Sequence, residues 1–231
     1  MSRELPILMS QPMVQAIQAG RKTMTRRVMI PQPGLCVGHV PDWQGQVLDW
    51  VGYRYSGRMH FFCYACGMGL KAVDEWSSHG IIAPYAPGDR LWVRESIRIC
   101  GSDADGEALQ QPLVIYQADG PIPVKALENY PHLRTARFMP KKYARLWLEV
   151  TAVKAERLQE ISEADAKAEG AGPGYVLASP TIFHKGRPKY TETPKDYREG
   201  FHRLWDSING KTHPWDSNPW VWAYTFKRIE R

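Results

Sequence analysis

Two long stretches of this 231-residue chain repeat a residue type at every second position, and this pattern restricts the fold more than any other feature. The stretches are residues 145–157 and residues 220–229. Apolar positions of the first are Leu146, Leu148, Val150 and Ala152, and the second carries aromatic residues at every second position. A period of two is typical of a β-strand with one buried face. Shorter extended segments are expected at residues 6–9, 22–29, 90–99 and 113–117.

Only three short helices are expected beside these strands. The first begins after Ser10, a favourable N-cap residue, and ends at Gly20, which suits the position after a helix C-terminus. The second begins after Ser162 and closes near Gly170, and the third covers Tyr197–Ile208 with one apolar stripe. This pattern argues against a doubly wound α/β fold. It favours an α+β fold, a small and mostly antiparallel β-barrel with peripheral short helices.

Two irregular segments interrupt the regular pattern. Residues 31–87 are rich in Gly and contain three of the four Cys, and residues 172–194 contain Gly and Pro at short intervals. Regular patterning resumes at Pro87, Gly88 and Asp89, which predict a turn. The length suits one domain of about 200 residues. We therefore expect a single domain over residues 1–231, with insertions at 31–87 and 172–194.

The composition restricts the environment and the partners. Hydrophobic residues make up 43% and charged residues 23% of the chain, which excludes a chain too polar to bury a core. The chain has 30 Lys and Arg against 24 Asp and Glu, a formal net charge of +6, which favours an anionic partner such as nucleic acid. No apolar run approaches the ~18 residues of a membrane span, and no secretory signal is visible. We expect a cytoplasmic protein without membrane contact.

Five segments in order resemble the ASCH domain, a family with a PUA-like β-barrel. The first is AGRKTMTRR at residues 19–27. The others are GDRLWVRE at residues 88–95, the strand 148–153 running into Leu158, ISEADAKAEG at residues 161–170, and NPWVW at residues 218–222 leading to Phe226. The resemblance is greatest to the phage and prophage branch of the family and covers roughly half of the chain.

This resemblance implies an activity and three residues at its centre. One branch of small ASCH proteins hydrolyses the amide of N4-acetylcytidine, and the Lys, Thr and Glu of that activity correspond to Lys22, Thr25 and Glu169. Other ASCH proteins resemble RNA-binding modules, and a ribonuclease activity has been associated with the domain. The resemblance therefore implies a nucleoside or single-stranded RNA as the partner more firmly than it implies one reaction.

These three residue types suit amide hydrolysis. Thr25 offers a hydroxyl nucleophile, which needs a base to remove its proton. Lys22 is the candidate base, and this role near neutral pH needs a pKa far below the lysine reference value of about 10.4. Glu169 either orients Lys22 or returns a proton to the leaving amine. On one strand Lys22 and Thr25 would point to opposite faces, so they converge only if Lys22 lies on the turn after Gly20.

Four further residues are candidates for substrate contacts. Arg26 either contacts phosphate or pairs with carboxylates. Arg94 and Glu95 form either a buried ion pair or part of the pocket wall. Trp92 is a core residue by default, although aromatic residues line PUA-like pockets and can stack on a base.

The cysteine spacing in residues 31–87 predicts a metal site. Cys63 and Cys66 are separated by two residues, and Cys36 and His39 repeat this separation upstream. Together they form a Cys₃His set, which suits a structural, tetrahedral Zn²⁺. Unliganded thiols are the alternative interpretation. Other candidates for the fourth ligand are His60, His79 and Cys100.

The first functional expectation is an amidohydrolase acting on an N4-acylcytidine type of nucleoside, and whether the chain is an enzyme stays open at this point. A non-catalytic RNA-binding module is the alternative, and its affinity should fall steeply with salt because bound phosphates release counterions. A ribonuclease would need an acid and a base, and His184 and His202 are the candidates for these roles.

Overall fold

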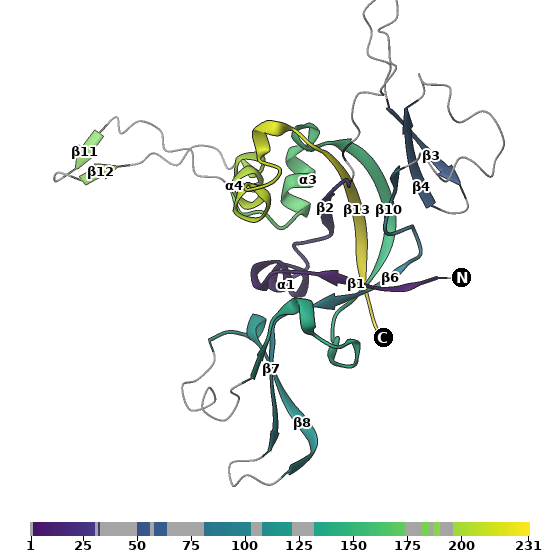
Figure 1. The fold of residues 1–231 in the computed structure, drawn as a ribbon. Coiled ribbons are helices and arrows are strands. Elements are labelled where there is room, and N and C mark those ends of the chain that lie inside the picture. Colours follow the sequence, from purple (N-terminus) through teal and green to yellow (C-terminus); the bar gives the residue numbers. More distant parts are fainter. Residues whose placement is uncertain are drawn as a thin grey trace, which may run out of the picture. The chain divides into compact units, whose positions relative to one another are not determined.

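The computed structural model describes residues 2–30, 32, 50–55, 58–63, 81–102, 108–121, 132–173, 182–184, 187–189 and 196–231. Within these residues the chain has the expected α+β fold, with several β-sheets and three α-helices (Figure 1). The helices are α1 (Gln11–Gln18), α3 (Glu163–Ala168) and α4 (Tyr197–Asn209).

The largest sheet has five strands in the order β1-β6-β10-β13-β2. They are β1 (Glu4–Leu8), β6 (Arg90–Arg94), β10 (Trp147–Arg157), β13 (Trp220–Ile229) and β2 (Met24–Val28). β1 pairs with β6 in parallel, whereas β6 with β10 and β2 with β13 are antiparallel. The order has two ends, so the described strands establish a sheet but not a closed barrel.

Three smaller antiparallel sheets complete the described strands. One contains β3 (Trp50–Tyr55), β4 (Arg58–Cys63) and β5 (Ile81–Ile82), the second β7 (Ile97–Ser102), β8 (Ala108–Tyr116) and β9 (His132–Arg134), and the third β11 (Ile182–His184) and β12 (Arg187–Lys189). The first and third lie in the segments expected to be irregular, and that expectation was wrong for these strands. In residues 50–63 aromatic side chains favour strands despite the neighbouring glycines.

The chain divides into two compact units. Unit 1 contains residues 1–23, 88–151 and 226–231, and unit 2 contains residues 24–87 and 152–225. The division falls within β10 and β13, so each of these strands contributes residues to both units. Lys22 belongs to unit 1, whereas Thr25 and Glu169 belong to unit 2.

In unit 1 the single strand expected over residues 90–99 is interrupted at Glu95 and Ser96. The backbone amide of Glu95 faces the Met139 sulfur at 3.2 Å, and the Ser96 carbonyl accepts a hydrogen bond from the Gln117 amide at 3.1 Å. These contacts draw the backbone away from a continuous ladder, and β6 and β7 belong to different sheets. The core beside them contains Trp92, Ile97, Met139, Ala144 and Trp147.

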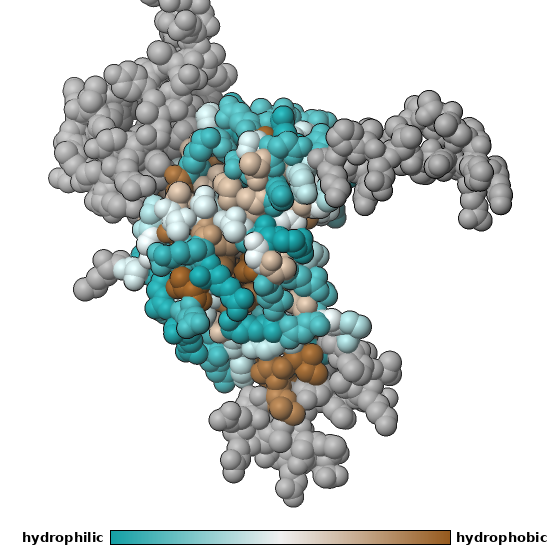
Figure 2. Space-filling model, turned by 180° about the vertical axis from the view of Figure 1, so that it is seen from behind, coloured by the Kyte–Doolittle hydropathy of each residue, from teal (hydrophilic) through white to brown (hydrophobic). Residues whose placement is uncertain are grey.

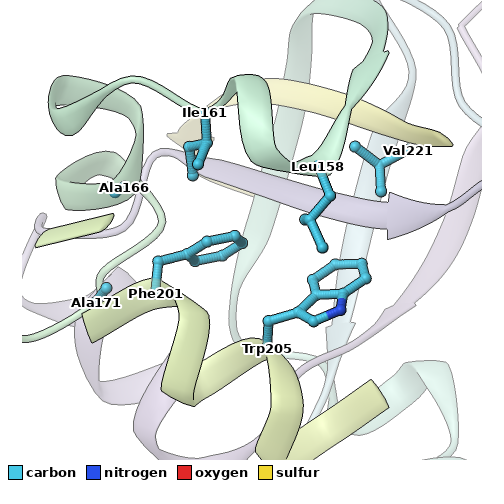
Figure 3. Packing of buried hydrophobic residues seen from close by; sticks show 7 residues of the cluster. All are labelled: Leu158, Ile161, Ala166, Ala171, Phe201, Trp205 and Val221. Atoms are coloured by element: carbon cyan, nitrogen blue, oxygen red, sulfur yellow. The ribbon is translucent and has the colours of Figure 1, made fainter. Parts of the chain in front are cut away.

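In unit 2 the helices α3 and α4 bury an apolar cluster, seen from close by in Figure 3. Its members are Leu158, Ile161, Ala166, Ala171, Phe201, Trp205 and Val221. The apolar stripe predicted for α4 is confirmed at Phe201 and Trp205, both 3% exposed. It does not extend to Ile208, which is 51% exposed.

Among the described residues, no helix has the length and apolar character needed to span a membrane. Figure 2 shows hydrophilic residues over most of the described surface on that face, with hydrophobic residues in separate areas. The large hydrophobic side chains with the greatest exposure are Leu8, Ile30, Leu113, Leu133, Phe138 and Ile208.

Candidate functional site

Lys22 follows a helix end that fixes its backbone. Gly20 has a φ of 69°, and the amides of Gly20 and Arg21 donate to the carbonyls of Ile17 at 3.0 Å and Ala16 at 2.8 Å. This pair of hydrogen bonds is the Schellman pattern of a helix C-terminus, as the Gly predicts. The Lys22 amide donates to the same Ala16 carbonyl at 3.0 Å, so Lys22 lies directly after the turn.

The three residues predicted from the resemblance are all buried. Lys22 and Thr25 are 2% exposed and Glu169 is 3% exposed. Among the described residues, tyrosines aside, only seven polar or charged side chains are buried, and the other four are Arg26, Asp89, Glu95 and Glu156. Burying a polar side chain costs free energy unless hydrogen bonds or ion pairs compensate. Ordinary surface roles for Lys22 and Glu169 are therefore excluded.

The two faces of β2 carry different chemistry. In the antiparallel pair of β2 and β13, Thr25 lies opposite Tyr224 and Arg26 lies opposite Ala223. Opposite residues share a face of the sheet, and successive residues alternate between faces. Thr25 and Tyr224 therefore share one face. Arg26 lies on the other face with the helices, where its guanidinium is 5.9 Å from the centroid of the Phe201 ring.

Arg26 gathers three carboxylates on that helix-covered face. Its Nε is 2.7 Å from Oε1 of Glu156, its Nη2 is 3.0 Å from Oδ2 of Asp165, and its Nη1 is 3.2 Å from Oε1 of Glu169. The Arg26 side chain has no exposed area. Arg26 was expected either to contact phosphate or to pair with carboxylates, and in the structure it pairs with carboxylates. The planar guanidinium suits such pairing.

Glu156 is a member of this group that the sequence did not reveal. The alternation predicts Ala152 inside, but Ala152 is exposed and Val153 and Glu156 are buried, so the pattern changes phase along β10. The exposed Lys154 donates to Oε2 of Glu156 at 2.9 Å, and this hydrogen bond raises the pKa of Lys154. The available signal was an acidic and a basic residue two positions apart within a strand.

Glu169 reaches Arg26 because a short helix places it there. Ser162 is the N-cap of α3, as predicted, and its Oγ accepts a hydrogen bond from the Asp165 amide at 3.1 Å. Asp165 and Glu169 lie four residues apart, so both face the same side of the helix. Gly170, with a φ of 77°, follows at the end of this helix.

Within unit 2 the structure brings Glu169 together with Arg26, while Thr25 lies on the opposite face of β2. β2 is the last strand in the described order of the sheet.

Arg94 and Glu95 do not form the ion pair that was one of their two expected roles. Glu95 is 2% exposed and accepts two hydrogen bonds from Arg145, each 2.9 Å long. Arg94 lies over the Trp92 ring at 5.4 Å from its centroid. Trp92 is 9% exposed and belongs to the core of unit 1, so its default interpretation is confirmed.

Tyr224 places an additional polar group beside Thr25. Its side chain has 0% exposure, and its hydroxyl has no hydrogen-bond partner among the described residues. The Tyr85 ring packs edge-to-face on it with centroids 5.1 Å apart, and the Tyr85 backbone lies close enough to the hydroxyl to act against the rise in its pKa. Burial raises the pKa of both tyrosines, while the positive charge of Arg27 acts in the opposite direction.

The predicted zinc ligands fall largely outside the described residues. Cys36, His39 and Cys66 lie there, as does the alternative ligand His79. The backbones of Cys63, His60 and Cys100 are described within β4 and β7, but their side chains are not. In the described part of the chain, no group of three or more His, Cys, Asp or Glu could hold a metal ion.

The two histidines considered for a ribonuclease are not brought together in the described contacts. His202 lies on α4, 3.1 Å from Oδ2 of Asp206, and stacks on Trp215 with centroids 4.8 Å apart. His184 ends β11, and its side chain lies outside what the structure describes. These contacts give the ribonuclease interpretation no support.

Comparisons with protein-family models, curated proteins and solved structures found no match for this chain.

Proposed function

We propose that this protein hydrolyses the amide of an N4-acylcytidine type of nucleoside, with Lys22, Thr25 and Glu169 as its catalytic residues. The observation that carries the proposal is their burial, at 2%, 2% and 3% exposure. A lysine in a basic run and a helix glutamate are ordinarily solvated, so their burial needs a reason. A catalytic site in which Lys22 is the neutral amine provides this reason, because a neutral amine costs less free energy to bury than a charged one.

In the proposed reaction the Thr25 hydroxyl attacks the acyl carbon, and Lys22, as the neutral amine, takes the hydroxyl proton. The bond between the acyl carbon and N4 then breaks, and the proton passes from Lys22 to the leaving amine of cytidine. Water hydrolyses the acyl ester on Thr25, which releases the carboxylic acid and restores both side chains.

We assign the orienting role to Glu169. Its Oε1 accepts a hydrogen bond from Nη1 of Arg26. The other two nitrogens of Arg26 donate to Glu156 and Asp165, which fix the position of the guanidinium. Hydrogen bonds between charged partners restrict the carboxylate to one position. A carboxylate held in this way suits the orientation of Lys22 better than the protonation of a leaving group.

We also propose that the chain is a member of the ASCH family with a PUA-like β-barrel, from the phage and prophage branch. The α+β content and the long strands β10 and β13 support this assignment. So does the local structure of residues 19–27, which form a helix end, a turn and the strand β2.

The test is the hydrolysis of N4-acetylcytidine to cytidine, followed by absorbance. We expect wild-type turnover and losses of at least about 100-fold in Lys22→Ala and Thr25→Val, because each variant removes a group that acts on the reacting atoms. Matched controls are Lys227→Ala and Thr151→Val, which change exposed residues of β13 and β10. Circular dichroism confirms that each variant is folded.

A wild-type protein without turnover would contradict the proposal, and RNA binding would then be measured. The affinity of an RNA-binding module should fall steeply between 50 and 200 mM salt, on the order of 10³-fold for six phosphate contacts. We rank this alternative second, because no specific contact among the described residues favours it. In unit 1, cations lie over two aromatic rings. Arg90 and Lys141 lie over the Trp147 ring, and Arg145 lies over the Tyr116 ring.

A further inference from the structure

The hydroxyl of Tyr224 is buried in unit 2 with no hydrogen-bond partner among the described residues. Leaving a buried hydroxyl without a partner costs free energy, so such groups are few in folded proteins and need an explanation. Phenylalanine would fill the same space at this position without that cost. The hydroxyl is therefore explained by a ligand that accepts its hydrogen bond and is bound only part of the time.

Tyr224 lies beside the proposed nucleophile. It is directly opposite Thr25 across the β2 and β13 pair, and Arg27 is opposite Trp222 in the same register. Directly opposite side chains on one face have Cβ atoms about 4.5–5.5 Å apart. A substrate whose acyl carbon meets the Thr25 hydroxyl therefore has its carbonyl oxygen within reach of this face.

The chemistry of this face suits an oxygen that gains negative charge. Burial raises the pKa of Tyr224 above the ordinary value of 10.0, so its hydroxyl is a neutral donor near neutral pH. Arg27 acts electrostatically on both Tyr224 and Tyr85, which places its positive charge on the same side. Donors aimed at a developing oxyanion are often the largest single contribution to acyl-transfer catalysis.

We propose that Tyr224 donates a hydrogen bond to the acyl carbonyl oxygen of the substrate as that oxygen becomes the oxyanion, with the Arg27 charge beside it. The Tyr85 ring packs edge-to-face on the Tyr224 ring and holds it in place. This inference rests on the proposed function and adds an oxyanion donor to it.

The experiment compares Tyr224→Phe with the wild type in N4-acetylcytidine hydrolysis and in urea unfolding. We expect kcat to fall about 100-fold with KM changed by less than about threefold, because the hydrogen bond strengthens in the transition state. We expect the unfolding midpoint to stay or rise, because no described partner loses a hydrogen bond.

The matched control is Tyr116→Phe. The Tyr116 hydroxyl donates to the Tyr143 carbonyl at 2.9 Å, so this variant removes a hydroxyl that has a structural partner. We expect it to lower the unfolding midpoint and to leave kcat unchanged. Opposite effects in the two variants separate a catalytic hydroxyl from a structural one.

Three results would overturn the inference. Full kcat in Tyr224→Phe together with inactive Lys22→Ala overturns it and leaves the proposed function in place. A Tyr224→Phe midpoint lowered as much as that of Tyr116→Phe assigns the hydroxyl to the structure. A wild-type protein without turnover overturns both the inference and the proposed function.

Discussion

A single guanidinium organises the polar interior of unit 2. Arg26 has no exposed side-chain area and contacts Glu156, Asp165 and Glu169. In a buried ion-pair network the desolvation of the charges opposes their attraction, so the network adds little net stability relative to apolar residues. Removal of one member is different, because the remaining charges stay buried without compensation.

We therefore expect Arg26→Met to lower the free energy of unfolding by about 3–5 kcal/mol. Urea unfolding followed by circular dichroism measures the change. The control is Arg203→Met on α4, where Arg203 is 53% exposed and pairs with Glu199. Exposed pairs contribute less than about 1 kcal/mol. Equal effects of the two substitutions would contradict the assignment of Arg26 as the centre of the network.

At the scale of elements, the end of α1 depends on the backbone freedom of Gly20. Its φ of 69° is in the left-handed region, and a Cβ at this position would meet nothing within 4 Å. The cost of a side chain is therefore conformational rather than steric. We expect Gly20→Ala to destabilise by about 1–2 kcal/mol and Gly20→Asn by less, because Asn tolerates this conformation.

Thermal unfolding at neutral pH checks this expectation. Gly172→Ala is the control, because Gly172 also has open space around a Cβ and no φ in the left-handed region. Replacing such a glycine is expected to be neutral or to stabilise by up to about 1 kcal/mol. Similar losses in Gly20→Ala and Gly172→Ala would contradict a role of the helix end.

The N-terminus of α4 predicts a pH dependence. Oδ1 of Asp196 accepts hydrogen bonds from the amides of Glu199 at 3.2 Å and Arg198 at 2.9 Å. These hydrogen bonds, that from Glu199 foremost, hold the pKa of Asp196 below its ordinary value of 3.8. The stabilisation is therefore present above pH 3.8 and is lost as pH falls through the lower native pKa.

We expect Asp196→Ala to lower the free energy of unfolding by about 1 kcal/mol at pH 7. The difference from the wild type should shrink as the pH is lowered from 4 toward 2, because the wild-type carboxylate becomes protonated. Urea unfolding over this pH range measures both effects. Asp196→Asn keeps a capping oxygen and should lose little at pH 7, and a difference that is constant with pH would contradict the capping role.

At the scale of the whole molecule, the sequence predicts elements better than contacts. The strand at residues 220–229, the helix at residues 197–208 and the caps at Gly20 and Ser162 agree with the structure because local periodicity and capping chemistry determine them. The break at Glu95 depends on Met139 and Gln117, which are distant along the chain, so no local signal predicts it.

The candidate site was also predicted only in part from the sequence. Burial of Lys22 and Glu169 agrees with the resemblance, but composition and spacing alone predict solvated charges at both positions. Glu156 and Tyr224 were not predicted as site residues, because the contacts that distinguish them arise only through tertiary folding. The role of such residues can be inferred only when the register of the sheet is known.

The predicted zinc site depends on long-range folding, because the metal would join residues from two parts of the segment 31–87. We expect about one Zn²⁺ per chain by elemental analysis after purification without chelators. Cys66→Ser should lose most of the metal, whereas Cys100→Ser should retain it if the ligands are Cys36, His39, Cys63 and Cys66. A metal-free wild type would contradict the prediction.

The hydrogen bonds after α1 also have a consequence for solvent exchange. The amides of Arg21 and Lys22 share one acceptor, the Ala16 carbonyl, only five and six residues earlier in the chain. Their protection from deuterium exchange therefore depends on one helical turn rather than on long-range pairing. The amide of Met29, which donates to Trp220 at 3.0 Å, depends on the distant strand β13. Exchange at these amides would thus reveal whether the backbone of Lys22 is held in place before β2 joins the sheet.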